Sequence, residues 1–188
     1  MNINTNQILE QSKQSVLQVL EQLKDVTIEP FQEFTIASSQ FRTMAMCNET
    51  ITNVLKTEYA VVYCIELENT NERKKLIKTF ETFCAVNKTN IKNVDRINHS
   101  KFNNGNSKTL YVGSSTSDFK SRLKDHLGVK KSGRTYALHL SKWDNNLEYT
   151  IKITTYKISK TESNIVELIE QQIWDQLQPV FGKRSGLL

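Results

Sequence analysis

A nine-residue run, YAVVYCIEL at residues 59–67, constrains the fold more than any other feature of this sequence. Its β-branched and aromatic residues favour a strand, and at its start apolar side chains occupy consecutive positions. A strand that points apolar side chains to both faces must be covered on both, like a central strand between layers of helices. The run therefore predicts the first strand of a main domain with a buried sheet.

The patterns on either side of this run predict the remaining elements. Apolar residues at helical spacing predict helices at residues 5–24, about 41–56, 71–87 and 163–177, with shorter helices ending at 127 and covering 135–143. Short strands are expected at residues 109–112 and 148–158, whereas residues 31–41 favour neither state. The order predicts a small mixed sheet with helices on its faces.

Composition limits the class of protein. With 188 residues, 38% of them apolar and 24% charged, the chain suits one domain plus an extension, and intrinsic disorder and a coiled-coil rod are excluded. No apolar run approaches the roughly 20 residues of a membrane span, and the polar N-terminus does not resemble a secretory signal. Cys47, Cys64 and Cys84 stand alone, which indicates reduced cysteines in a cytoplasmic protein.

The charge is unevenly distributed along the chain. Residues 1–58 carry a net −3, although the whole chain carries +5, and residues 71–134 hold 15 basic and 5 acidic residues. A basic stretch in an otherwise balanced protein is typical of a polyanion binder. A solvated, lysine-rich surface remains the other interpretation of the same charges.

Several side chains stand where they could take part in chemistry. Arg122 and His126 lie four residues apart on a predicted helix, so they share a face and could bind and protonate a phosphate. Glu170 projects from the apolar stripe of the last helix, where a carboxylate needs a cation, a metal or a proton. Tyr63 and Tyr111 lie in two predicted strands that could bring both phenols to one sheet edge. Each observation has an alternative. Arg122 and His126 could be an ordinary pair on a helix surface, and Glu170 could form a structural salt bridge. The two tyrosines could be core residues whose hydroxyls reach the rim of the core.

Taken in order, these residues resemble the motifs of the GIY-YIG nuclease superfamily. The resemblance covers residues 59–186 and rests on YVGSS at 111–115, Asp118-Phe119, Arg122, His126, VVY at 61–63, and Glu170 nine residues before Pro179. Val61 replaces the glycine of the first motif, and Gly182 stands where the family usually has an asparagine. The two tyrosine motifs, usually close together, are separated here by an insertion.

The resemblance implies an α/β (α+β) fold with a mixed, mainly antiparallel three-stranded sheet flanked by helices. Residues 1–58 would form an N-terminal helical extension, and residues 59–188 the nuclease-like domain with an insertion at about 68–108. The implied activity is hydrolysis of DNA phosphodiester bonds with Mg²⁺ or Mn²⁺, in a restriction-type or phage-defence role. Its catalytic residues would be Tyr63, Tyr111, Arg122, His126 and Glu170, with Glu170 holding the metal.

DNA is the expected partner, bound through phosphate contacts that carry no base sequence. The residues expected to make these contacts are Lys120, Lys124, Lys130, Lys131, Arg134, Tyr136, Lys183 and Arg184. A homodimer would let so small a protein cut both strands. The alternatives are a catalytically degenerate member of the family that binds nucleic acid without cutting it, and an RNA-binding or partner-binding domain with a basic face.

Overall fold

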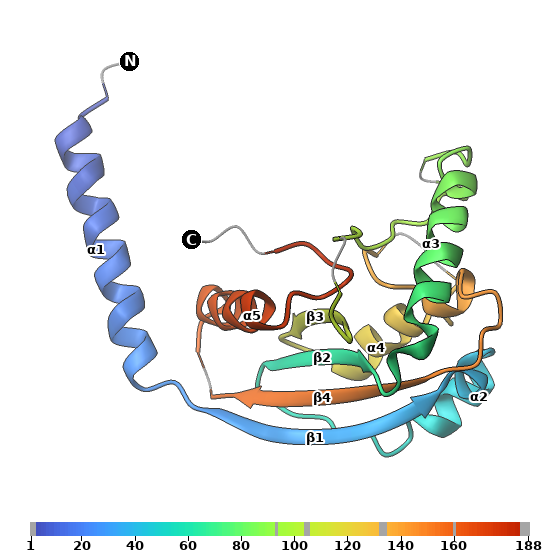
Figure 1. Ribbon diagram of the computed structural model, residues 1–188. Helices are drawn as coiled ribbons and strands as arrows, with labels where there is room; N and C mark the ends of the chain where they lie inside the picture. The colour runs from blue at the N-terminus through green and yellow to red at the C-terminus, as the bar shows by residue number, and fades with distance from the viewer. Residues whose placement is uncertain (1–2, 93, 104–105, 132–134, 160, 185–188) are drawn as a thin grey trace.

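The computed structural model describes residues 3–92, 94–103, 106–131, 135–159 and 161–184 (Figure 1). Four strands and five α-helices follow one another along this part of the chain. In order they are α1 (Thr5–Lys24), β1 (Ile28–Ala37), α2 (Met44–Thr50), β2 (Val61–Leu67), α3 (Arg73–Asn87), β3 (Thr109–Ser115), α4 (Phe119–Leu127), β4 (Thr150–Ile158) and α5 (Ser163–Leu177). Short 3₁₀ turns lie at Ser38–Phe41, Thr70–Glu72 and Leu140–Lys142.

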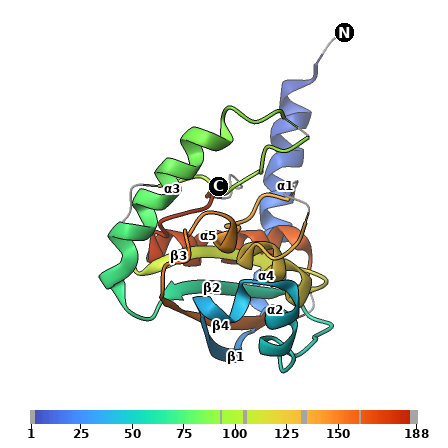
Figure 2. The same ribbon diagram turned by 90° about the vertical axis from the view of Figure 1, so that its right-hand side faces the viewer.

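The strands form one sheet in the order β1-β4-β2-β3, and every pair in it is antiparallel. The α/β class with helices around a small sheet is therefore confirmed, but the sheet has four strands instead of three and no parallel pair. Figure 2 shows the strands stacked from β3 at the top to β1 at the bottom, with α3 rising above the β3 edge.

The fourth strand is β1, which the sequence placed within a helical extension. Phe34 and Ile36 pair with Ile153 and Ile151 of β4, and the register shifts between Pro30 and Gln32. Because β1 is an edge strand, Pro30 costs it no hydrogen bond to a further strand, so the proline marks a bulge and not the end of an element. Residues 28–37 are thus part of the sheet.

Alternate residues of β2 contribute to two separate apolar clusters. Val61, Tyr63, Ile65 and Leu67 pack with residues of α2, α3 and α4. Val62 and Cys64 pack with Val112 of β3 and with α5, together with the base of α1. The sheet is thus covered on both faces, as the run at 59–67 predicts.

Two expected helices are much shorter than the sequence suggests. The helix expected at about 41–56 is α2, which spans only Met44–Thr50, and the one expected at 135–143 is a single turn at Leu140–Lys142. His139, just before that turn, is buried with a positive φ of 53°, so the backbone cannot be helical there. All three cysteines are free, and no helix among the described residues is long and apolar enough to cross a membrane.

Candidate active site

The β2–β3 pair places two tyrosines side by side on the face that α4 covers. Tyr63 lies opposite Gly113, and Ile65 lies opposite Tyr111. The two tyrosine rings are 6.2 Å apart between centroids and nearly parallel. A Cβ on Gly113 would come within 2.6 Å of the Tyr111 ring and 2.8 Å of the Tyr63 hydroxyl, so only glycine fits between them.

Helix α4 brings a guanidinium and an imidazole to the same place. Asp118 caps the helix by accepting a hydrogen bond from the Ser121 N–H, and Gly128 ends it with a φ of 84°. Between these ends, Arg122 and His126 lie one turn apart on the side that faces the sheet. The arrangement follows from the buried positions of Phe119, Leu123 and Leu127, which fix the rotation of the helix.

Hydrogen bonds join these four side chains into one group, which we call the tyrosine cluster: Tyr63, Tyr111, Arg122 and His126. The Tyr63 hydroxyl lies 2.8 Å from Nε2 of His126 and 3.3 Å from Nε of Arg122. Nη2 of Arg122 is 3.4 Å from the Tyr111 hydroxyl and 2.8 Å from the backbone oxygen of Tyr136. Nη1 of Arg122 has no hydrogen-bond partner within the described residues.

The proton of His126 can be placed from its two neighbours. Burial, with smaller contributions from the charges of Arg122 and His139, holds the pKa of His126 well below its ordinary value, so the ring is neutral at neutral pH. Nδ1 accepts a hydrogen bond from the Leu138 backbone N–H at 3.3 Å, so the ring proton must be on Nε2. Nε2 therefore donates to the Tyr63 oxygen, and that oxygen accepts two hydrogen bonds.

Both phenols keep their protons in the resting protein. Burial raises the pKa of Tyr63 well above its ordinary value, and the neighbouring Tyr111 raises it further, whereas Arg122 lowers it. The pKa of Tyr111 is also raised, mainly by burial, and is likewise lowered by Arg122. Ionisation of either phenol therefore needs positive charge beyond that of Arg122.

Glu170 reaches this region from the opposite face of the sheet. It lies on α5 beside the edge strand β3, and its carboxylate is near the hydroxyl and the backbone N–H of Ser114. Burial raises the pKa of Glu170, Glu167 adds to this, and Ser114 and the charge of Arg122 oppose it. The carboxylate thus lies close enough to Arg122 of the tyrosine cluster for the two charges to interact.

The donors at this place fit a hard divalent cation with few protein ligands. Within the described residues, no three or more His, Cys, Asp or Glu side chains are grouped so that they could hold a metal. Glu170 would therefore be the main protein ligand, and water and phosphate oxygens would supply the others. Mg²⁺ binds in this manner, because it keeps several waters and takes one or two carboxylates together with substrate phosphates.

Three of the residues expected to contact DNA already have partners in the protein, and a fourth is half-buried. The Lys130 ammonium is 2.8 Å from the carboxylate of Asp125, and the Arg184 guanidinium is 2.7 Å from that of Asp175. Lys120 donates to the backbone oxygen of Thr52, and Lys124 is half-buried. These four side chains are therefore less available than the sequence suggests.

The other expected contacts differ in how they are placed. Lys131 and Lys183 are exposed. Tyr136 exposes its ring to solvent, and only its backbone oxygen takes part in the tyrosine cluster. Arg134 lies outside the described residues.

The segment after α5 closes over the tyrosine cluster. Val180 and Phe181 donate backbone hydrogen bonds to Thr109 and Leu110 of β3. Gly182 follows with a φ of 116°, and a Cβ there would lie 3.3 Å from the Tyr111 ring. Asn103, at the end of the insertion, donates its side-chain N–H to the oxygen of Gly182 at 2.9 Å. An asparagine thus lies beside the position where the sequence lacks one, although it comes from another part of the chain.

The sequence did not single out Ser114 or Leu138 as parts of the site. Ser114 could have been found from the alternation of β3, because it follows Val112 on the face opposite Tyr111 and Gly113. The Leu138 N–H carries no sequence signal, since any residue other than proline supplies a backbone donor.

Two adjacent tyrosines, an arginine that contacts both phenols and a nearby carboxylate are groups that could bind a phosphodiester and a cation. Residues 98–184, a little under half of the chain, match the family model described as the GIY-YIG catalytic domain, which supports membership of the GIY-YIG nuclease superfamily. The match begins after β2 and does not include Tyr63. The role expected of Tyr63 therefore rests on its position beside Tyr111, Arg122 and His126 in the structure. No curated protein and no solved structure matches the chain. The family indicates a nuclease-type function, and its members generally depend on a divalent metal.

Proposed function

We propose that this protein is a divalent-metal-dependent endonuclease that hydrolyses DNA phosphodiester bonds. The observation that carries the proposal is the tyrosine cluster, in which Arg122 contacts both phenols and still has Nη1 without a partner among the described residues. Glu170, beside Ser114, lies close enough for its charge to interact with Arg122. These groups supply a base, an anion-binding cation and a metal ligand.

Tyr63 would take the proton of the attacking water as a phenolate, after its own proton has passed to solvent. Its oxygen accepts hydrogen bonds from His126 and Arg122, and both bonds become stronger when the phenol ionises. The ring of His126 has both nitrogens engaged, so it acts through Tyr63 and not directly on water. Tyr111, which shares Arg122, is placed to help orient the water.

Arg122 stabilises the phosphorane that forms when water attacks phosphorus. Its Nη1 would meet a non-bridging oxygen as negative charge grows there. Water supplies the new P–O bond, the bond to the leaving sugar oxygen breaks, and that oxygen takes a proton from solvent. Mg²⁺ or Mn²⁺ on Glu170 would supply positive charge that lowers the pKa of nearby phenols and polarises the phosphate.

The insertion at 68–108 would position the DNA. Of its basic residues, Arg73 and Arg96 donate to backbone oxygens of the loop that follows α3, so they hold the insertion together. The lysines that are exposed and without carboxylate partners among the described residues are Lys74, Lys78, Lys88, Lys92 and Lys101. Contacts between these and the phosphates would fit a restriction-type or phage-defence nuclease. The boundaries of the nuclease-like domain, residues 59–188, remain a prediction, with β1 added to its sheet.

Cleavage of supercoiled plasmid DNA tests this function. We expect nicking or linearisation with Mg²⁺ or Mn²⁺ and none with EDTA, and loss of cleavage by about 10²-fold or more in Arg122→Ala and Glu170→Gln. Glu167→Gln, an exposed carboxylate one turn from Glu170, is the matched control and should cut normally. Salt-sensitive binding without cleavage in the wild-type protein would favour the catalytically degenerate module instead.

A further inference from the structure

Helix α1 carries an apolar stripe that this chain does not cover. Its members Ile8, Leu9, Val16 and Leu20 are between 50% and 56% exposed, and none of the 20 residues of α1 is buried. Figure 1 shows the helix projecting away from the sheet. A helix of this length gains most of its stability by packing such a stripe against something. A stripe of this size on a helix marks an interaction surface.

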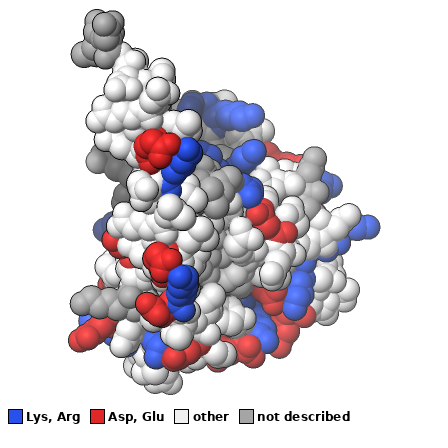
Figure 3. Space-filling view, turned by 90° about the vertical axis from the view of Figure 1, so that its left-hand side faces the viewer, with Lys and Arg blue, Asp and Glu red and all other residues white. Residues whose placement is uncertain are grey.

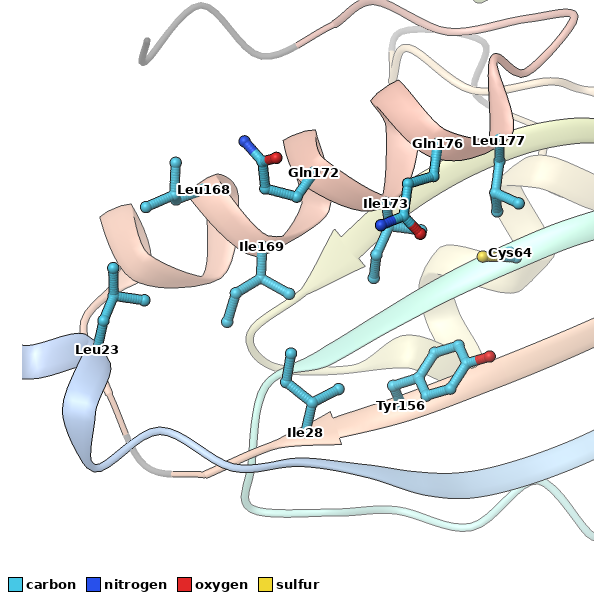
Figure 4. A pocket seen from close by; sticks show the side chains of 10 residues that line it. All are labelled: Leu23, Ile28, Cys64, Tyr156, Leu168, Ile169, Gln172, Ile173, Gln176 and Leu177. Atoms are coloured by element: carbon cyan, nitrogen blue, oxygen red, sulfur yellow. The ribbon is translucent and has the colours of Figure 1, made fainter.

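The stripe continues into the core at its C-terminal end. Val19 and Leu23 are half-buried and pack against the cluster that contains Ile165 and Ile169 of α5. Beside them is a groove of about 680 Å³, which we call the α5 groove. Figure 4 shows Leu23 from α1, Ile169 and Ile173 from α5, and Tyr156 from β4 around it. An uncovered helix and an uncovered apolar groove therefore adjoin on one molecule.

Charge indicates what kind of partner fits. Residues 5–24 contain two acidic and two basic side chains, which form the ion pairs Glu10–Lys13 and Glu21–Lys24, each at 2.7 Å. Figure 3 shows this side of the molecule, where the surface of α1 is largely uncharged. A neutral helix on a chain of net charge +5 does not attract a polyanion, and it allows two like copies to approach.

We propose that the occupant is a second copy of this chain, bound so that the two α1 helices pack antiparallel. With 20 residues, α1 is about 30 Å long and about 10 Å across, so one helix face offers roughly 300 Å². A stable interface buries about 800 Å² on each partner, so the helices alone do not suffice. Antiparallel packing lays Ile8 and Leu9 of each copy over the α5 groove of the other, which adds the walls of that groove to the interface.

This arrangement makes a geometrical prediction at Val16. The stripe runs from Ile8 to Leu23, so its midpoint, close to Val16, falls at the two-fold axis of a symmetric pair. The same residues of the two copies meet there, whereas Gln18, on the opposite side of the helix, points away from the partner. The interface is independent of the tyrosine cluster, so the proposal does not rest on the nuclease function.

Light scattering on the full chain at tens of micromolar tests the pairing. We expect twice the chain mass of 21.7 kDa for the wild type and for Gln18→Glu, and the single mass for Val16→Glu, which places a charge in the interface. A monomeric wild type overturns the proposal. A monomer is also the result expected if the surface binds a different protein instead of a second copy. A Val16→Glu variant that stays dimeric overturns it as well.

Oxidative cross-linking separates a true contact at Val16 from a mere loss of folding. Val16→Cys should give a covalent dimer that disappears on reduction, while Gln18→Cys and the wild type, with its own three cysteines, should not. Equal cross-linking of both variants would contradict the antiparallel arrangement. Because neither measurement uses DNA, both can succeed or fail whatever the outcome of the cleavage assay.

Discussion

At the scale of single residues, the hydrogen bonds around Tyr63 support its proposed role as the base. Two donors converge on one phenol oxygen, and one of them is a neutral imidazole whose other nitrogen is bound to a backbone N–H. Burial still keeps the phenol protonated in the resting state. Under the proposed function, a divalent cation bound near the site would supply the added positive charge that makes the phenolate accessible.

His126 should also make the free energy of unfolding depend on pH. Its folded pKa is lowered, so below the unfolded value of about 6.5 the unfolded chain binds a proton that the folded protein does not. The stability that His126 contributes is therefore present above pH 6.5 and is lost as the pH falls from there toward the folded pKa. The loss approaches about 1.4 kcal/mol per pH unit.

Urea unfolding between pH 7.5 and 5.5 measures this effect. The free energy of unfolding of the wild type should fall more steeply with decreasing pH than that of His126→Gln, which cannot titrate. His139, whose pKa is also lowered, is present in both proteins and cancels from the difference. Parallel pH dependences would show that His126 takes up its proton while folded.

At the scale of elements, α3 is anchored in the core on one side and presents lysines to solvent on the other. Leu76 and Phe80 anchor the helix in the core, and Lys74 and Lys78 lie on its exposed surface. If these lysines contact phosphates, a variant with both changed to serine should bind DNA more weakly on every sequence. The slope of log K against log salt should decrease in magnitude by about 2.

The control for this experiment is a pair of lysines on β4. Lys152 and Lys157 already form ion pairs with Glu33 and Glu29, so their replacement by serine changes the net charge equally without removing a phosphate contact. Fluorescence anisotropy with a labelled duplex at several salt concentrations measures both variants. Equal slopes for the two variants would contradict a role of α3 in DNA binding.

The elements differ in whether the sequence alone could predict them. The strand at 59–67 and the helix with Arg122 and His126 were predictable, because burial on both faces and i, i+4 spacing are local patterns. Strand β1 was not, since Pro30 breaks a local pattern and only the pairing with β4 shows that it is a bulge. The contact between Asn103 and Gly182 depends on a separation of 79 residues that no local pattern reveals.

At the scale of the whole molecule, pairing through α1 would place two cleavage sites in one complex. If both the nuclease function and the pairing hold, wild-type protein should linearise plasmid in one binding event. The monomeric Val16→Glu variant should mainly nick it, because each molecule cuts one strand. A time course of nicked and linear DNA, with Gln18→Glu as the control, measures this. Linear DNA formed equally fast by both variants would show that pairing does not serve cleavage.

The bulge in β1 has a consequence for how copies of this chain can meet. An exposed edge strand offers unpaired N–H and C=O groups to any other chain, and edge-to-edge addition is a common route to aggregation. Pro30 removes one of these donors, the register shift beside it bends the strand, and Glu29 and Glu33 add charge along it. The sheet is therefore protected against growth by strand addition, and self-association is left to the helical surface at the other end of the N-terminal segment.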